Sequence, residues 1–283
     1  MPFWWLGQSL VQVEDVELPE QADVIVSEPM GFLLVHERML ESFMVARDRF
    51  LKPGGLVMPT TGTMFFGPFS DQAMWDEQDA KVTFWETEDF WGLNLQPLKQ
   101  QARVDHFSQP VVGYFPPSIL LSTETSSYMV DFLKDKKEKL LEFDVPFAFE
   151  AGRTAILHGI AGWFDVLFRG TANKVPLSTS PYTAGTHWYQ CRFLLEDPLA
   201  VNRGQKVSGN MHFLSNSKYS YDITLTISID GVGITRTAKF SLADQYFAYY
   251  SGTDAGAAAA TPAVPSAWAS GDAAAGTYPD ASY

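Results

Sequence analysis

The chain has 283 residues, 46% of them hydrophobic, which is enough to build the core of one large domain or two smaller ones. No apolar run reaches the length of a membrane span, and a net charge of −13 argues against nucleic acid as a direct ligand, because phosphate binding needs basic patches. The single cysteine, Cys191, cannot form an internal disulfide, which fits a reducing compartment, and no Cys or His cluster has metal-ligand spacing.

The first predicted elements lie in residues 13–57. Residues 23–26 form a short apolar run that is typical of a buried parallel strand. A helix is expected from about His36 to Leu51, because apolar residues recur there at helical spacing: Met39, Phe43, Ala46 and Phe50. The segment Lys-Pro-Gly-Gly at 52–55 is expected to end this helix, since it combines a cation with two kinds of helix breaker.

Two glutamates, Glu28 and Glu37, stand nine residues apart: Glu28 follows this strand and Glu37 opens this helix. Pro29 and Gly31 lie between them and allow the loop to turn back, so that two carboxylates can face one cation. A guanidinium fits best, because its planar fork of donors pairs with carboxylates two bonds at a time. The acidic chain also suits a basic partner. In the alternative interpretation of the two glutamates, their carboxylates are solvated and only complement the helix dipole. In the alternative interpretation of the net charge, it only keeps the protein soluble.

The periodicity changes from helical to alternating at about Met58. Residues 222–231 alternate cleanly and end at a turn, and further strands are expected at 162–170, 187–195 and 206–214. Cys191 falls in one of these strands and is expected to be a buried, inert thiol. Many short strands separated by turns predict an antiparallel sandwich or barrel.

Two stretches depart from the strand pattern. Residues from about 71 to 103 hold five aromatic side chains among acidic and amide residues, and these rings either form an interface or fill a small core of their own: Trp75, Phe84, Trp85, Phe90 and Trp91. Residues 251–283 are rich in Ala, Gly, Ser and Pro and are expected to be a disordered tail.

Several motifs resemble those of the protein arginine methyltransferases. The motif Ser-Glu-Pro-Met-Gly at 27–31, followed by Glu-Arg-Met-Leu-Glu at 37–41, resembles the double-glutamate loop of the coactivator-associated, type I branch. Thr-His-Trp at 186–188 resembles a second loop of that family, and the segments 107–112 and 162–166 are similar to the same branch. The resemblance runs in order from about Val13 to Phe247, and residues 1–12 do not match.

This resemblance implies roles for particular residues. Glu28 and Glu37 would hold the substrate guanidinium, and one of them would take the proton after transfer. Met39 would line the site and limit methylation to two methyl groups on one nitrogen, although it also suits helix packing. His187 and Trp188 would close the arginine pocket, with packing in a strand-rich region as the alternative.

The resemblance also implies S-adenosylmethionine as cofactor. Glu14 would accept a hydrogen bond from the adenine amine, and Ser42 would lie near the adenine, although an isolated acidic residue is usually only solvated. No Gly-rich turn or ribose-binding acidic residue precedes Glu14. Two hypotheses follow. In the first, which we favour, the sequence is an incomplete record of a longer enzyme whose start is wrongly set. In the second, the chain is a short product that folds without binding the cofactor.

The fold implied by the resemblance is α/β plus β. Residues 13–57 would be the last piece of a Rossmann-like methyltransferase domain, and residues 58–250 a β-barrel that binds substrate, with a helical dimerisation arm at about 71–103. The complete enzyme would form asymmetric dimethylarginine in histones and other nuclear or RNA-binding proteins, in nucleus and cytoplasm, as a homodimer. The alternative is a non-catalytic barrel that pairs with intact subunits and regulates them.

Overall fold

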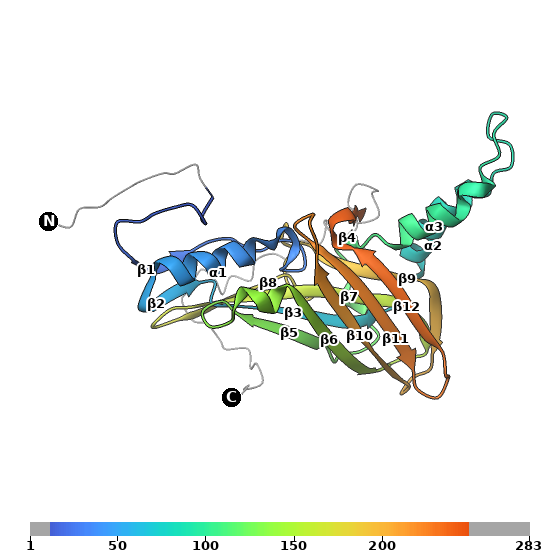
Figure 1. Cartoon of the computed structure of the whole chain (residues 1–283). Coiled ribbons are helices and arrows are strands. Elements are labelled where there is room, and N and C mark those ends of the chain that lie inside the picture. The colour runs from blue at the N-terminus through green and yellow to red at the C-terminus, as the bar shows by residue number, and fades with distance from the viewer. Residues whose placement is uncertain (1–11, 249–283) are drawn as a thin grey trace.

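A computed structural model describes residues 12–248, drawn in colour in Figure 1. Of the predicted unmatched start, only Gln12 belongs to this part, and the predicted tail at 251–283 lies outside it. None of the helices in this part is both long and apolar enough to cross a membrane.

The N-terminal part is a two-stranded parallel sheet covered by one helix. Strand β1 (Ala22–Val26) pairs with β2 (Leu51–Met58), and helix α1 (Met39–Phe50) packs against both strands. The expected strand is present, but the expectation that it is buried is wrong, because within residues 12–248 it has one neighbouring strand. The side chains of Val24 and Val26 are consequently 45% and 70% exposed.

The helix ends where the sequence indicates, and the chain continues directly into β2. Residues 52–55 belong to β2 and bulge outward from the ladder, since Ala22 pairs with Leu51 while Val24 already pairs with Leu56. Gly54 supplies the left-handed φ of 80° that this bulge requires. The Pro and Gly residues therefore shape a bulge.

Two sheets form the antiparallel barrel that the alternating pattern predicted. One sheet has the order β12-β11-β10-β6, and the other has the order β13-β4-β9-β7-β3-β5 with β8 paired to β7. Contacts of β5 with β6 and of β12 with β9 bring the two sheets together. The strands are β3 (Thr61–Phe69), β4 (Val111–Gly113), β5 (Ser126–Asp131), β6 (Glu142–Glu150), β7 (Ala155–Arg169), β8 (Lys174–Ser178), β9 (Gln190–Val201), β10 (Lys206–Ser215), β11 (Tyr221–Ile229), β12 (Thr235–Ser241) and β13 (Tyr246–Phe247).

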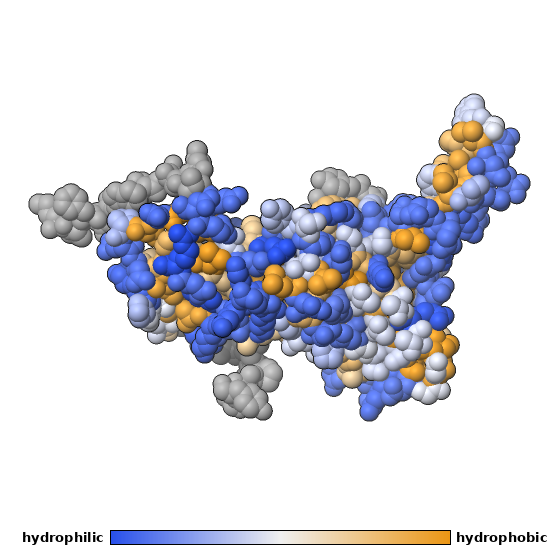
Figure 2. All heavy atoms as spheres, viewed as in Figure 1, coloured by the Kyte–Doolittle hydropathy of each residue, from blue (hydrophilic) through white to orange (hydrophobic). Residues whose placement is uncertain are grey.

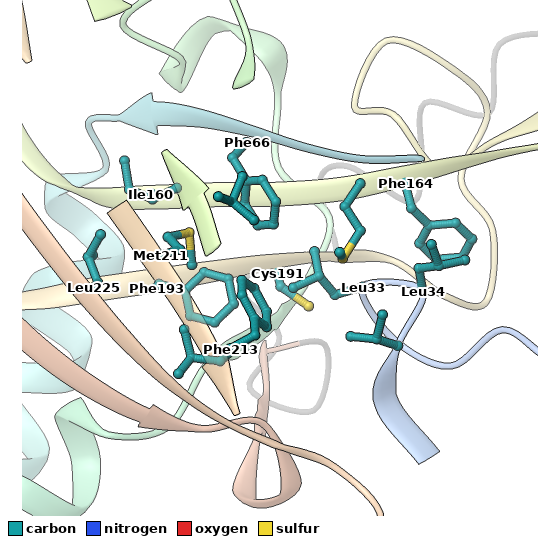
Figure 3. Close-up of a cluster of buried hydrophobic side chains, with 14 of the residues drawn as sticks. Leu33, Leu34, Phe66, Ile160, Phe164, Cys191, Phe193, Met211, Phe213 and Leu225 are labelled. Carbon is teal, nitrogen blue, oxygen red and sulfur yellow. The ribbon is translucent and has the colours of Figure 1, made fainter. Parts of the chain in front are cut away.

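Strand β11 shows how the sequence builds the core. Its side chains alternate between buried and less buried along the whole strand, as the sequence pattern predicted. On the same face of this sheet, the Phe143 ring lies parallel to the Phe213 ring with 4.7 Å between ring centroids, and Tyr221 of β11 meets both rings edge-on. Figure 3 shows Phe213 and Leu225 among the buried side chains of this core. The same buried cluster contains Leu33 and Leu34 from the glutamate loop, so the loop and the barrel share one core.

An arm projects from the barrel between β3 and β4 (Figure 1). It consists of helices α2 (Gln72–Thr83) and α3 (Lys99–Phe107) with two 3-10 turns between them. The Phe84 ring contacts the rings of Trp85 and Phe90 edge-on, yet these aromatics leave apolar surface near the far end, where Trp91 is 92% exposed (Figure 2). The aromatic rings of the arm therefore pack on one another only in part, and that they form an interface stays a prediction.

A polar network fixes the root of the arm to the barrel. Asp71 caps α2 by accepting a hydrogen bond from Met74 N, and its other oxygen lies 3.1 Å from Nη1 of Arg192, which is buried on β9. Asp71 N donates to Nδ1 of His158 on β7, and Nε2 of His158 lies 3.1 Å from Oε1 of Gln72. Because Nδ1 accepts, the buried His158 is neutral with its proton on Nε2.

Stability is expected to fall in mild acid because of His158. Burial lowers the pKa of His158 below its usual 6.5. The unfolded chain therefore binds a proton that the folded chain excludes, and the free energy of unfolding decreases as the pH falls below about 6.5. Urea titrations between pH 5 and 8 measure this slope. His158→Asn retains an acceptor for Asp71 N without titrating, so it should flatten the slope, and an unchanged slope would contradict the assignment.

Candidate functional site

The glutamate loop, residues 27–38, joins β1 to α1 in a tight, strained path. Gly31 and Leu34 form an isolated bridge, and a Cβ on Gly31 would lie 2.0 Å from the carbonyl oxygen of His36. Four non-glycine residues have left-handed φ angles of 50° to 69°: Leu33, Leu34, Glu37 and Arg38. Such angles cost free energy and persist only where surrounding contacts enforce them, and they are typical of functional sites.

The barrel supplies part of this enforcement through two glycines. A Cβ on Gly62 of β3 would lie 2.8 Å from Cδ2 of Leu34, and a Cβ on Gly162 of β7 would lie 2.8 Å from Cδ1 of Leu33. Both leucine side chains are buried. The two strands therefore leave room for the loop to insert its apolar side chains into the barrel core.

Glu28 and Glu37 are both exposed, while Pro29 and Met30 between them are buried. The buried residues anchor the loop and leave both carboxylates accessible to a ligand. Glu37 lies in a 3-10 turn (His36–Arg38) just before α1, so it precedes the helix that it was expected to open. That the two carboxylates hold one guanidinium stays a prediction.

The turn at 186–189 is fastened to the glutamate loop. Trp188 is buried, its Nε1 donates to the carbonyl oxygen of Met30 at 2.9 Å, and its ring meets Phe164 edge-on. His187 packs on Trp188 with 3.8 Å between ring centroids, and its Nε2 lies 3.7 Å from Oε1 of Glu28. Residues separated by about 160 positions thus meet beside Glu28, and both predicted residues precede β9 instead of lying in it.

Trp188→Phe is expected to loosen this junction. The substitution keeps an aromatic ring but leaves the carbonyl of Met30 without its donor, which costs about 1–3 kcal/mol for a buried acceptor. Urea denaturation followed by circular dichroism measures the loss. Tyr182→Phe is the matched control, because it removes a polar group from an aromatic ring that is 64% exposed. Equal stability of the two variants would contradict the role of this hydrogen bond.

The two predicted cofactor residues contact one another. Ser42 Oγ on α1 donates to Oε1 of Glu14 at 2.6 Å, which lowers the pKa of the Glu14 carboxyl. Arg49, two turns further along α1, donates to the carbonyl oxygens of Val13, Glu14 and Val16. The helix therefore holds the segment that carries Glu14 beside Ser42.

Two other predicted features have clear positions. Met39 is half-buried at the first residue of α1, and the buried stripe of that helix runs through Leu40, Phe43 and Met44. Cys191 is fully buried, which raises its pKa to about 12 and makes it inert, as expected. In the described part of the chain, no group of three or more His, Cys, Asp or Glu side chains can hold a metal ion.

Several contacts that surround Glu37 were not predicted from the sequence. Arg38 forms a bidentate pair with Glu41 through hydrogen bonds of 2.6 and 2.9 Å. The spacing of three residues on a helix could have indicated this pair. Hydrogen bonds from His36 and Arg38 to the turn between β10 and β11 have no signal in the sequence, because the partners are about 180 residues away.

Comparison with known proteins identifies the class. Residues 60–231 match the arginine methyltransferase oligomerization subdomain, which is more than half of the chain. The chain therefore belongs to the protein arginine methyltransferase family, and the predicted family is confirmed.

Curated relatives show which members of the family the chain resembles. The chain is 45% identical over 255 residues to the probable histone-arginine methyltransferase CARM1 of Oryza sativa subsp. indica, covering 86% of this chain and 48% of that protein. It is 41% identical over 238 residues to the histone-arginine methyltransferase CARMER of Drosophila ananassae, covering 84% and 44%. The chain thus spans about half the length of the curated relatives that it matches.

Solved structures share the fold. A chain of the Trypanosoma brucei PRMT1 enzyme-prozyme heterotetrameric complex with AdoHcy superposes with a TM-score of 0.71 and 26% identity, over 82% of this chain and 71% of that chain. Protein arginine methyltransferase 10 of Arabidopsis thaliana has a TM-score of 0.72 at 24% identity, over 82% and 73%, and supports the fold alone.

Proposed function

We propose that this chain supplies the arginine-binding loop and the barrel of an S-adenosylmethionine-dependent protein arginine N-methyltransferase. The substrates are histones and other nuclear or RNA-binding proteins, and the product is asymmetric dimethylarginine, formed in the nucleus and cytoplasm. One observation carries the proposal: the exposed carboxylates of Glu28 and Glu37 flank a buried, strained loop to which the turn with His187 and Trp188 is fastened.

The chemistry follows from the charges. Glu28 and Glu37 pair with a guanidinium and draw its positive charge away from one nitrogen, which becomes the better nucleophile. The same contacts orient that nitrogen toward the methyl donor. Arginine cannot lose its proton beforehand, so one carboxylate accepts it as the new N–C bond forms. Met39 borders the loop and limits the space for further methyl groups, and His187 and Trp188 close the pocket.

The residues present fit one edge of the cofactor. Glu14 is exposed and uses one oxygen to accept from Ser42, so its carboxylate retains capacity to accept from an adenine amine. Ser42 fixes that carboxylate beside α1. When bound, S-adenosylmethionine would supply the methyl group, and its S–C bond would break as the N–C bond forms. The contact that the described residues offer to the cofactor is this one, at the adenine.

The test is methyl transfer by the purified protein. It is incubated with isotope-labelled S-adenosylmethionine and a histone H3 tail peptide, and the product is identified by mass spectrometry. Asymmetric dimethylarginine is expected, and none should form on a peptide with lysine in place of arginine. Absence of transfer under conditions where a complete family member modifies the same peptide would overturn catalysis by this chain.

A second candidate function is a non-catalytic module that pairs with intact subunits. One similar solved structure is a complex of an enzyme with a prozyme, and this similarity supports the second candidate function. The apolar far end of the arm, with Trp91, would form the contact, as it would in a homodimer. Sedimentation of the chain alone and mixed with an intact arginine methyltransferase distinguishes the two. Co-sedimentation without transfer by the chain itself would favour the module.

A further inference from the structure

The conformation of Glu37 needs support from outside its own loop. Glu37 and Arg38 have left-handed φ angles of 69° and 55°, and each such angle on a non-glycine residue costs about 1–3 kcal/mol. Backbone hydrogen bonds within the loop, such as those from Arg38 N to Val35 O at 3.2 Å and from His36 N to Phe32 O at 3.1 Å, supply local support. Other contacts must hold the backbone in place.

The residue before Glu37 reaches the turn between β10 and β11. Nδ1 of His36 lies 2.9 Å from the hydroxyl of Ser220, which is fully buried. The His36 ring stacks on Phe32 with 5.9 Å between centroids. Burial lowers the pKa of His36, which keeps the ring neutral so that Nδ1 can accept from the hydroxyl.

The residue after Glu37 reaches the same turn. Nη1 of Arg38 donates to the carbonyl oxygen of Asn216 at 2.9 Å. Its Nε and Nη2 donate to the two oxygens of Glu41, so the guanidinium has a fixed orientation. Glu37 therefore lies between two side chains that are both tied to one turn of the barrel.

The turn itself is rigid enough to act as a support. Oδ1 of Asn216 accepts from the backbone N–H groups of Lys218 and Ser220 at 3.0 and 3.1 Å, and Asn216 N donates to Ser220 O at 2.8 Å. Nδ2 of Asn216 also donates to Asp222 at the start of β11. These hydrogen bonds connect the turn to the ladder of the four-stranded sheet.

We propose that the β10–β11 turn, residues 216–220, is a positioning element for Glu37 and acts through His36 and Arg38. The inference rests on the proposed function, in which Glu37 binds the guanidinium. It assigns to the barrel a role in setting the geometry of a carboxylate that belongs to a different part of the chain. A misplacement of about 1 Å at such a group can lower the rate on the order of 10²-fold.

The first measurement is steady-state methylation of an arginine peptide by Ser220→Ala, His36→Leu and His36→Asn. We expect Ser220→Ala and His36→Leu to lower kcat roughly tenfold or more, with the KM for S-adenosylmethionine unchanged. His36→Asn should restore most of kcat, because its Oδ1 can accept from Ser220 as Nδ1 does. The matched control is Ser208→Ala, which removes a hydroxyl from the same sheet, away from the loop. Equal kcat for His36→Leu and His36→Asn would overturn the proposal.

The second measurement needs no substrate. Amide hydrogen exchange of His36 and Arg38 should quicken in Ser220→Ala and remain unchanged in Ser208→Ala. If the wild-type protein transfers no methyl group, the proposed function fails, while exchange alone still decides whether the turn holds the loop. Unchanged exchange in Ser220→Ala overturns the positioning role. If Ser220→Ala does not fold, Arg38→Gln decides in its place, by the same exchange measurement.

Discussion

Glu28→Gln is expected to lower methyl transfer to arginine roughly 10²–10³-fold, the range found when a single electrostatic contact to a transition state is removed. Glutamine has nearly the same shape but carries no charge, and its amide N–H groups repel the guanidinium donors. Because the Glu28 side chain is 66% exposed, the free energy of unfolding should change by less than about 0.5 kcal/mol. Loss of activity with an intact fold is the signature of a residue that contacts the substrate.

The comparison needs two further variants. Glu37→Gln should lower methyl transfer by a similar factor, since both carboxylates are proposed to bind one guanidinium cation. Glu124→Gln, an exposed carboxylate on the barrel, should leave kcat and KM at wild-type values. All variants are assayed at saturating S-adenosylmethionine with an arginine peptide. Near-normal activity of Glu28→Gln would refute the assigned role.

Asp71→Ala is expected to destabilise the protein by about 3 kcal/mol and to free the arm from the barrel. The substitution removes a carboxylate partner of Arg192, whose side chain is 3% exposed, and breaking a buried ion pair by removing one partner is costly. It also removes the cap of α2, worth about 1 kcal/mol. Arg192 retains its position over the Phe115 ring, which moderates the loss.

Urea denaturation and sedimentation velocity measure the two consequences of Asp71→Ala. The control is Asp105→Ala on α3, where the carboxylate is exposed and accepts from Gln101. The Asp105 variant should resemble the wild type in both experiments. If Asp71→Ala unfolds at the wild-type urea concentration, the network at the arm root does not contribute to stability.

Local patterns predicted much of the fold. Residues 222–229 alternate because one face of β11 meets the core, and α1 follows from the helical spacing of Phe43 and Ala46. Burial of β1 was predicted wrongly, because an apolar run records what a strand can bury and does not show which strands are present beside it. The bulge at 52–55 was missed since Pro and Gly suit a bulge as well as a turn.

The candidate site was found by motif, but its geometry depends on distant contacts. Trp188 meets Met30, and Arg38 meets Asn216, across more than 150 residues of sequence. The left-handed angles at Leu33 and Leu34 could not be predicted, because leucine rarely adopts them and only the space left by two glycines of the barrel makes them tolerable.

The shared core of the glutamate loop and the barrel affects how this protein can be recombined with its relatives. A chimera joined at about residue 58, where the sequence changes periodicity, would separate Leu33 and Leu34 from the two glycines that accommodate them. In a foreign barrel, a larger residue at either glycine would approach a leucine methyl group to about 2.8 Å and force the side chains of the loop to shift. The smallest exchangeable unit therefore begins ahead of Glu28 and carries the loop, α1 and the barrel together.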